Sequence, residues 1–149
     1  RMSRGLGDVY KRQVVNVVDL MKLEPSTKHP HGLTDAEYDA LFTKDKPIVF
    51  AFHGYHTLIH ELTYRRNNRN LHVYGYQEEG TITTPFDMRV QNEIDRFNLV
   101  KNAVCFLPQL GNRGSYLVQQ MNDKLVEHKQ YIHEYGLDLP EVRDWKWDL

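Results

Sequence analysis

The chain has 149 residues, a length that suits one domain with a single hydrophobic core. Its 19 basic and 20 acidic side chains nearly cancel, so no field of one sign is present to attract nucleic acid or an anionic membrane. The longest apolar runs, such as Ile48 to Phe52, are far shorter than the roughly 20 residues that cross a bilayer, and we expect a cytoplasmic protein.

The first residues of the chain show no hydrophobic periodicity. We interpret residues 1–13 as a non-native or disordered segment and place the folded domain at 14–149. The boundary falls where a β-branched run begins, because Val14 to Asp19 is typical of a buried strand.

Helix and strand patterns alternate through the middle of the chain. Thr34 and Glu37 have the spacing of a capping box, which predicts a short helix that ends at about Phe42. The segment 47–52 is nearly all apolar, as in a central strand that is covered on both faces. The residue pattern then predicts a helix over 56–66 and a strand over 71–76.

Two long helices are predicted in the C-terminal half. The first is capped by Thr84, and its apolar face comprises Phe86, Val90, Ile94 and Phe97. The second covers 115–135 and ends at Gly136. Between them, 105–107 is either a short strand or a loop, and Cys105, the only cysteine, is interpreted as a small buried hydrophobe rather than a reactive thiol.

This alternation of strands and helices indicates an α/β fold with a mostly parallel open sheet flanked by helices. In such sheets ligands gather beyond the carboxyl ends of the strands, near helix N-termini that favour anions. His53 and Tyr55 occupy that position, directly after a predicted strand, and are therefore candidate ligand or interface residues. The alternative is a structural role, in which Gly54 provides the flexible backbone of a turn and the side chains of His53 and Tyr55 pack against the domain or cap the helix.

Arg65 and Arg66 are the other candidate ligand or interface residues. Near the end of a helix they complement its dipole, which explains them without a ligand. The alternatives are pairing with carboxylates of a neighbouring domain and bidentate binding of a phosphate. His56 and His60 share a helical face, but we identify no third ligand and predict no metal site.

Sequence motifs that define an active site are absent. The chain contains no phosphate-binding P-loop, no dinucleotide-binding glycine fingerprint and no nucleophile elbow. From the residues alone we predict no catalytic residue, and the pattern indicates an α/β domain with one strand end that suits an anion.

Several blocks of the sequence nevertheless resemble one family, the xylulose-5-phosphate/fructose-6-phosphate phosphoketolases, in their C-terminal domain. The resemblance covers nearly all of 14–149, and the blocks that carry it include 15–21, 29–33, 45–55, 62–66, 83–88 and 140–145. It implies a domain like the C-terminal domain of transketolase-type enzymes, belonging to a carbon–carbon lyase of the aldehyde-lyase class.

The resemblance also implies the chemistry and partners of a parent enzyme. Such an enzyme uses thiamine diphosphate and magnesium to cleave a ketose phosphate with inorganic phosphate, forming acetyl phosphate and an aldose phosphate. Its cofactor is held by two preceding domains, which are the expected partners of this chain together with further copies in a homo-oligomer.

The chain carries no family motif for the metal diphosphate, so we expect this fragment to bind no cofactor and to be inactive alone. The expected role is that of a structural and assembly domain, and regulation through a bound anion is a further hypothesis. The alternative is a free-standing anion-binding α/β module without catalysis.

Overall fold

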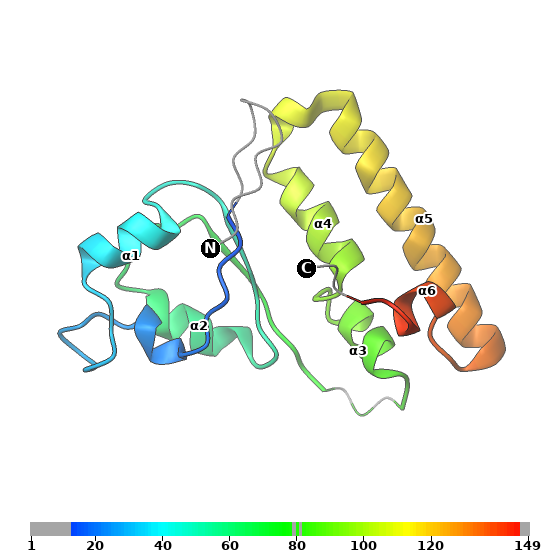
Figure 1. The fold of residues 1–149 in the computed structure, drawn as a ribbon, viewed down its shortest axis with the longest axis horizontal. Coiled ribbons are helices and arrows are strands. Elements are labelled where there is room, and N and C mark those ends of the chain that lie inside the picture. Colours follow the sequence, from blue (N-terminus) through cyan, green and yellow to red (C-terminus); the bar gives the residue numbers. More distant parts are fainter. Residues whose placement is uncertain (1–12, 79, 81, 147–149) are drawn as a thin grey trace.

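The computed structural model describes residues 13–78, 80 and 82–146. All of the predicted non-native segment except Gln13 therefore lies outside the described residues. The elements in chain order are η1 (Leu20–Leu23), α1 (Asp35–Phe42), β1 (Ile48–Ala51), α2 (His56–Thr63), β2 (Leu71–Tyr74), α3 (Pro85–Gln91), α4 (Arg96–Cys105), η2 (Pro108–Leu110), α5 (Gly111–Tyr135) and α6 (Pro140–Arg143). Helices α1 and α2 lie on one side of the molecule, and α3 to α6 lie on the other (Figure 1).

The predicted capping box at the start of α1 is confirmed. The Glu37 amide donates to the Thr34 hydroxyl at 3.3 Å, and the Thr34 amide donates to a Glu37 carboxylate oxygen at 2.9 Å. These hydrogen bonds lower the pKa of Glu37, the backbone contribution of Thr34 being the larger and its hydroxyl the second. Helix α1 ends at Phe42, as the pattern predicts.

The sheet is parallel, as predicted, but much smaller than expected. Strands β1 and β2 pair in register from Ile48 with Leu71 to Ala51 with Tyr74, and α2 forms the connection between them. Within the described part of the chain these are the two strands of the sheet, so β1 has one neighbour. The prediction that it is central and covered on both faces is wrong, and Ala51 is exposed.

The predicted strand from Val14 to Asp19 is also wrong. The segment leads into η1 without pairing, and none of the hydrogen bonds among described residues involves the backbone of 14–18. It runs beside the free edge of β1, where Val15 to Val17 and 49–52 line a common hollow. β-Branched residues favour an extended chain, but a strand also needs a partner within hydrogen-bonding distance.

The helix predicted to begin after Thr84 is two helices. Helix α3 ends at Gln91, Glu93 adopts a left-handed backbone with φ 57°, and α4 begins at Arg96. The buried Asp95 carboxylate accepts hydrogen bonds from the amides of Phe97 at 2.8 Å and Asn98 at 3.1 Å. The break arises because this side chain caps a new helix instead of continuing the old one.

Helices α4 and α5 form an antiparallel hairpin that extends from the sheet (Figure 1). Helix α5 begins at Gly111, earlier than predicted, and ends as predicted at Gly136, whose φ is 66°. Cys105 is the last residue of α4 and is exposed, so both a strand there and a buried thiol are excluded. The next residue, Phe106, stacks on His72 of β2 with ring centroids 3.9 Å apart, which joins the hairpin to the sheet.

The main core lies between η1, α1 and α2. Its buried residues are Leu23, Tyr38, Phe42, Ile59 and Leu62, with partly buried side chains of both strands packed against them. In the C-terminal half, the buried hydrophobic residues among those described are Phe97 and Leu139. The N-terminal half therefore provides most of the hydrophobic stabilisation.

One buried guanidinium connects the elements around this core. Arg66 is 1% exposed and lies over the ring of Tyr38, at 4.3 Å from its centroid. Its Nε donates to the carbonyl of Leu23 at 2.9 Å, and its Nη2 donates to those of Glu24 at 2.7 Å and Leu33 at 2.9 Å. Its Nη1 pairs with the Asp35 carboxylate at 2.8 Å.

Arg66→Ala should strongly destabilise the chain, because three carbonyl groups lose a donor and a cavity opens beside Tyr38. We expect a loss of at least about 3 kcal/mol in the free energy of unfolding, measured by urea denaturation. Arg65→Ala is the matched control, since Arg65 is exposed and should change the free energy by about 0.5 kcal/mol or less. Equal midpoints for the two variants would contradict the structural role of Arg66.

Candidate functional site

His53 and Tyr55 lie directly beyond the carboxyl end of β1, where the sequence places them. The His53 ring stacks on Tyr76, which follows β2, with centroids 4.2 Å apart and planes inclined by 16°. Tyr76 is held by its amide, which donates to the Gly54 carbonyl at 2.8 Å, and by its hydroxyl, which is 3.5 Å from the sulfur of Met88. His53 is exposed and Tyr55 is 65% exposed, so the two strand ends present aromatic rings to solvent.

The N-terminus of α2 is closed by the backbone that follows β2. A Cβ atom at Gly75 would lie 2.6 Å from the amide nitrogen of His56 and 2.7 Å from the Gly54 carbonyl oxygen. Amides at a helix N-terminus are the groups that hold an anion. Gly75 packs against the first of these amides, that of His56. This strand end therefore resembles an aromatic contact surface more than a phosphate-binding pocket.

The two candidate arginines do not join this surface. They follow α2 at its opposite end, about 14 Å from its start at a rise of 1.5 Å per residue. Arg66 uses its guanidinium inside the domain, which leaves Arg65 as the cation that faces solvent. The Nε of Arg65 donates to the Tyr64 hydroxyl at 2.7 Å, and its guanidinium lies 5.2 Å from that ring.

No metal centre is formed by the described residues, in which no three histidine, cysteine or acidic side chains gather. His56 and His60 meet edge to face at 5.9 Å, a contact between rings without a third ligand. At the start of α3, Thr84 caps the helix and its hydroxyl donates to Asp138 at 2.5 Å. Thr84, the last residue of the polar loop before α3, therefore has a structural role.

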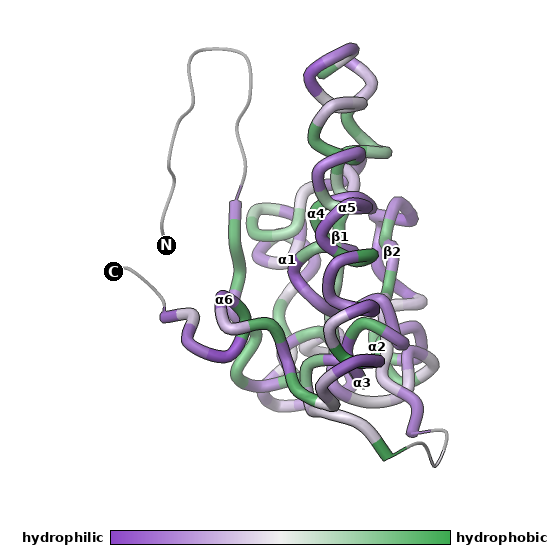
Figure 2. Tube along the Cα trace, turned by 90° about the vertical axis from the view of Figure 1, so that its right-hand side faces the viewer, coloured by the Kyte–Doolittle hydropathy of each residue, from purple (hydrophilic) through white to green (hydrophobic). Residues whose placement is uncertain are grey.

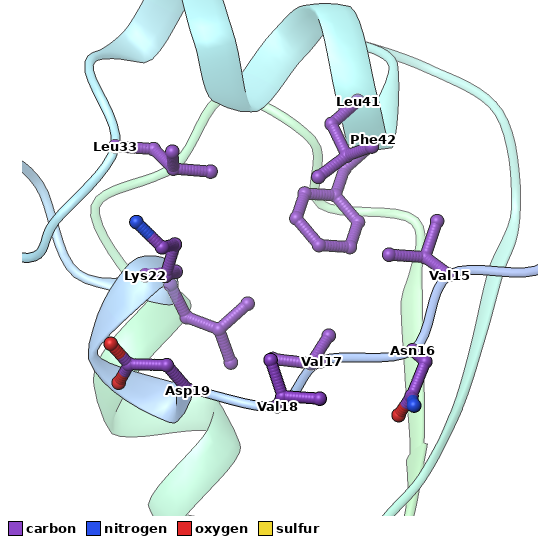
Figure 3. Close-up of a pocket in the computed structure, with 10 residues that line it drawn as sticks. Val15, Asn16, Val17, Val18, Asp19, Lys22, Leu33, Leu41 and Phe42 are labelled. Atoms are coloured by element: carbon purple, nitrogen blue, oxygen red, sulfur yellow. The ribbon is translucent and has the colours of Figure 1, made fainter. Parts of the chain in front are cut away.

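A second hollow, of about 140 Å³, lies between the start of the domain and α1 (Figure 3). It is lined by Val15, Asn16, Val17, Val18, Asp19, Lys22, Leu23, Leu33, Leu41 and Phe42. Small-molecule sites usually have volumes of about 300–1,000 Å³ and several convergent polar groups. This hollow is smaller and largely apolar, so it suits side chains of a protein better than a metabolite.

Two tyrosines have a raised pKa for reasons of packing. Burial raises the pKa of Tyr38, and the positive charge of Arg66 opposes that effect. Burial also raises the pKa of Tyr74, with a smaller contribution from the negative charge of Glu93. Both shifts keep a phenol neutral inside a contact between elements, as expected of structural residues.

Comparison with known proteins places the chain in a family. The sequence model of the XFP C-terminal domain matches residues 5–147. The chain belongs to this family. It is 70% identical over 139 residues to a probable phosphoketolase of Clostridium acetobutylicum, 60% over 138 residues to one of Gloeobacter violaceus and 56% over 149 residues to one of Chlorobaculum tepidum.

These alignments cover 93%, 92% and 99% of this chain but 18%, 17% and 19% of the three relatives. The family resemblance inferred from the sequence is therefore confirmed, and the chain spans less than a fifth of the phosphoketolases that it matches. In the described part, no helix has the length and apolar character that crossing a bilayer requires.

Gly75 and Tyr76, which contact the candidate residues at the strand ends, are not among the sequence-predicted site residues. The alternation of 71–76 predicts that Gly75 and Tyr76 belong to the strand, but β2 ends at Tyr74 and the chain then crosses the start of α2. A glycine in an otherwise regular strand pattern was the available signal, since it marks close approach of another backbone.

Gly75→Ala tests the closure of the α2 N-terminus. The added methyl group would meet backbone atoms at 2.6 Å and 2.7 Å, so we expect destabilisation by about 1–3 kcal/mol in urea unfolding. Gly54→Ala is the comparison, because its Cβ would meet the movable ring of Phe52, and it should cost less. A neutral Gly75→Ala variant would show that this space is open.

Proposed function

We propose that this chain is the C-terminal assembly domain of a thiamine-diphosphate-dependent phosphoketolase and contributes no catalytic residue. The parent enzyme would cleave xylulose 5-phosphate or fructose 6-phosphate with phosphate, forming acetyl phosphate and an aldose phosphate. The observation that carries the proposal is the family match over 5–147, combined with coverage of less than a fifth of each relative.

The residues of this domain do not fit the cofactor. Magnesium prefers oxygen ligands gathered around one point, and the described residues form no such acidic group. A diphosphate would need free donors, but Gly75 closes the start of α2, and the internal bonds of Arg66 occupy its guanidinium. We therefore assign thiamine diphosphate and magnesium to the preceding domains of the parent enzyme.

An assembly role is supported by the apolar side chains left at the surface. At the ends of the two strands, His53 is exposed and stacks on Tyr76, and Tyr55 is 65% exposed. Exposed apolar patches commonly mark contacts with other proteins. The alternative, a free-standing anion-binding module, has less support because the two hollows, of about 140 Å³ and 240 Å³, are both smaller than usual small-molecule sites, and the hollow in Figure 3 is largely apolar.

The isolated chain should neither bind thiamine diphosphate in calorimetry nor form acetyl phosphate from fructose 6-phosphate and phosphate. In the full-length enzyme, deletion of the domain should disrupt the oligomer, measured by analytical ultracentrifugation. The intact enzyme and a no-protein blank are the controls. Turnover by the isolated chain, or a fully assembled and active enzyme without it, would refute the proposal.

Alanine at His53, Tyr55 or Arg65 in the full-length enzyme should weaken assembly, because these exposed side chains are contact candidates. The turnover of the remaining intact oligomer should fall by no more than about tenfold. Arg65→Lys, which keeps the charge, is the control for Arg65→Ala. A loss of kcat on the order of a thousandfold in an assembled variant would instead indicate a lost transition-state contact.

A further inference from the structure

His128 is a polar side chain in the interior of the C-terminal half. Helix α5 carries hydrophilic and hydrophobic residues in alternation along its length (Figure 2), and its buried residues are Gly114 and His128. The side chain of His128 is 0% exposed, yet neither of its ring nitrogens has a hydrogen-bond partner among the described residues. Buried polar groups are nearly always hydrogen-bonded, so an imidazole in this position requires a physical reason.

One carboxylate lies beside this imidazole. Nε2 of His128 is 3.4 Å from Oδ1 of Asp87 on α3, which is longer than an ordinary hydrogen bond but close enough for an ion pair. The Asp87 side chain is itself mostly buried, and its other oxygen, Oδ2, accepts hydrogen bonds from the Thr83 hydroxyl and the Gln91 side-chain amide, both at 2.8 Å. Oδ1 is therefore the oxygen that can accept a proton donated by Nε2.

The other charged groups on the elements around His128 bind elsewhere or face solvent. Those on α4, on α6 and after α5 have partners of their own: Asp95 caps α4, Arg96 lies over the Phe97 ring, Lys101 donates to Asn98, Glu141 pairs with Lys124, and Asp138 accepts a hydrogen bond from Thr84. Arg89 of α3 and Glu127 and Lys129 of α5 are exposed. Among the described residues, Asp87 is thus the acid whose carboxylate lies within 4 Å of a His128 nitrogen.

Two opposing effects act on a proton at His128. Burial disfavours the charged imidazolium, and its Nδ1–H would have no acceptor among the described residues. The adjacent Asp87 carboxylate favours the imidazolium, because the two opposite charges attract each other strongly where water is excluded. Histidine is also the side chain whose charge ordinarily changes between pH 5 and pH 8. A pair with costs and gains of this kind is suited to reversible protonation.

We propose that His128 and Asp87 form a proton-operated contact between α5 and α3. Uptake of a proton from solvent converts the imidazole to an imidazolium, whose Nε2–H donates a charge-assisted hydrogen bond to Oδ1 of Asp87, and the distance of 3.4 Å between the two atoms shortens. Loss of the proton at higher pH leaves a neutral ring beside the carboxylate and loosens the contact. This inference goes beyond the proposed function and does not depend on it.

Helix α3 connects this contact to the surface at the strand ends. The helix lies beside α4 (Figure 1) and has no buried residue, so contacts such as that of Asp87 determine its position. Met88 follows Asp87, and its sulfur is 3.5 Å from the hydroxyl of Tyr76, the ring on which His53 stacks. A tighter hold of α5 on Asp87 therefore fixes Met88 against Tyr76, and the packing below the aromatic surface becomes sensitive to pH.

NMR titration of the 149-residue chain between pH 5 and pH 8 tests the contact. The ¹⁵N shifts of the imidazole rings report the protonation midpoint of each histidine, and the methyl shift of Met88 reports the position of α3. His128 and the Met88 methyl group should titrate together. Asp87→Asn, which removes the charge at constant size, should lower the midpoint of His128 by at least about 1 pH unit, because the imidazolium loses its counter-ion.

His133, an exposed histidine of the same helix, provides the matched control. Its midpoint should be the same in the wild-type chain and in Asp87→Asn, and His133→Gln should preserve the titration of the Met88 methyl group. His128→Gln should abolish that titration. Far-UV circular dichroism verifies that each variant is folded.

Three results would overturn the inference: a His128 ring that stays uncharged down to pH 5, an unchanged His128 midpoint in Asp87→Asn, or a Met88 methyl group that does not respond to His128. If Asp87→Asn does not fold, the wild-type chain decides the question. The carboxyl ¹³C signal of Asp87 should then shift with the same midpoint as His128, and an Asp87 signal that is independent of His128 would exclude the contact.

Discussion

The buried guanidinium of Arg66 is the interaction on which the N-terminal half depends. It connects the end of η1, the loop before α1 and α1 itself to the residues that follow α2. A charged group in this position is tolerated because four of its N–H groups have oxygen acceptors and its plane lies on the Tyr38 ring. Asn68 extends the connection by donating to the carbonyls of Phe42 and Lys46, which fixes the turn between α1 and β1.

The contacts of Arg66 and Asn68 also fix the geometry of the surface at the carboxyl ends of the two strands. With α2 held at its far end, Gly75 packs against its first amide, and His53 stacks on Tyr76 above the sheet. The result is a set of fixed aromatic rings with solvent on one side. Such a surface is suited to contact with another protein, which agrees with the proposed assembly role.

The C-terminal half differs from the N-terminal half in that polar side chains make up much of its buried interior. Asp95 and His128 are buried there, and the His128 ring meets Phe86 edge to face at 5.1 Å, with Nε2 3.4 Å from Asp87. The α4–α5 hairpin reaches the sheet through the stack of Phe106 on His72. Among its described residues only Phe97 and Leu139 are buried hydrophobics, so this half gains little stability from its own core.

The sequence by itself determined the features that depend on residues close together in the chain. The Thr34–Glu37 capping box, the stop at Gly136 and the strands of the sheet were predictable because each is set by contacts or periodicity within a few positions. Only the tertiary structure decided that Arg66 is buried, since its partners lie 31 to 43 positions away. It also decided that Val14 to Asp19 has no strand partner among the described residues, because β propensity describes one segment, whereas a strand requires a second one beside it.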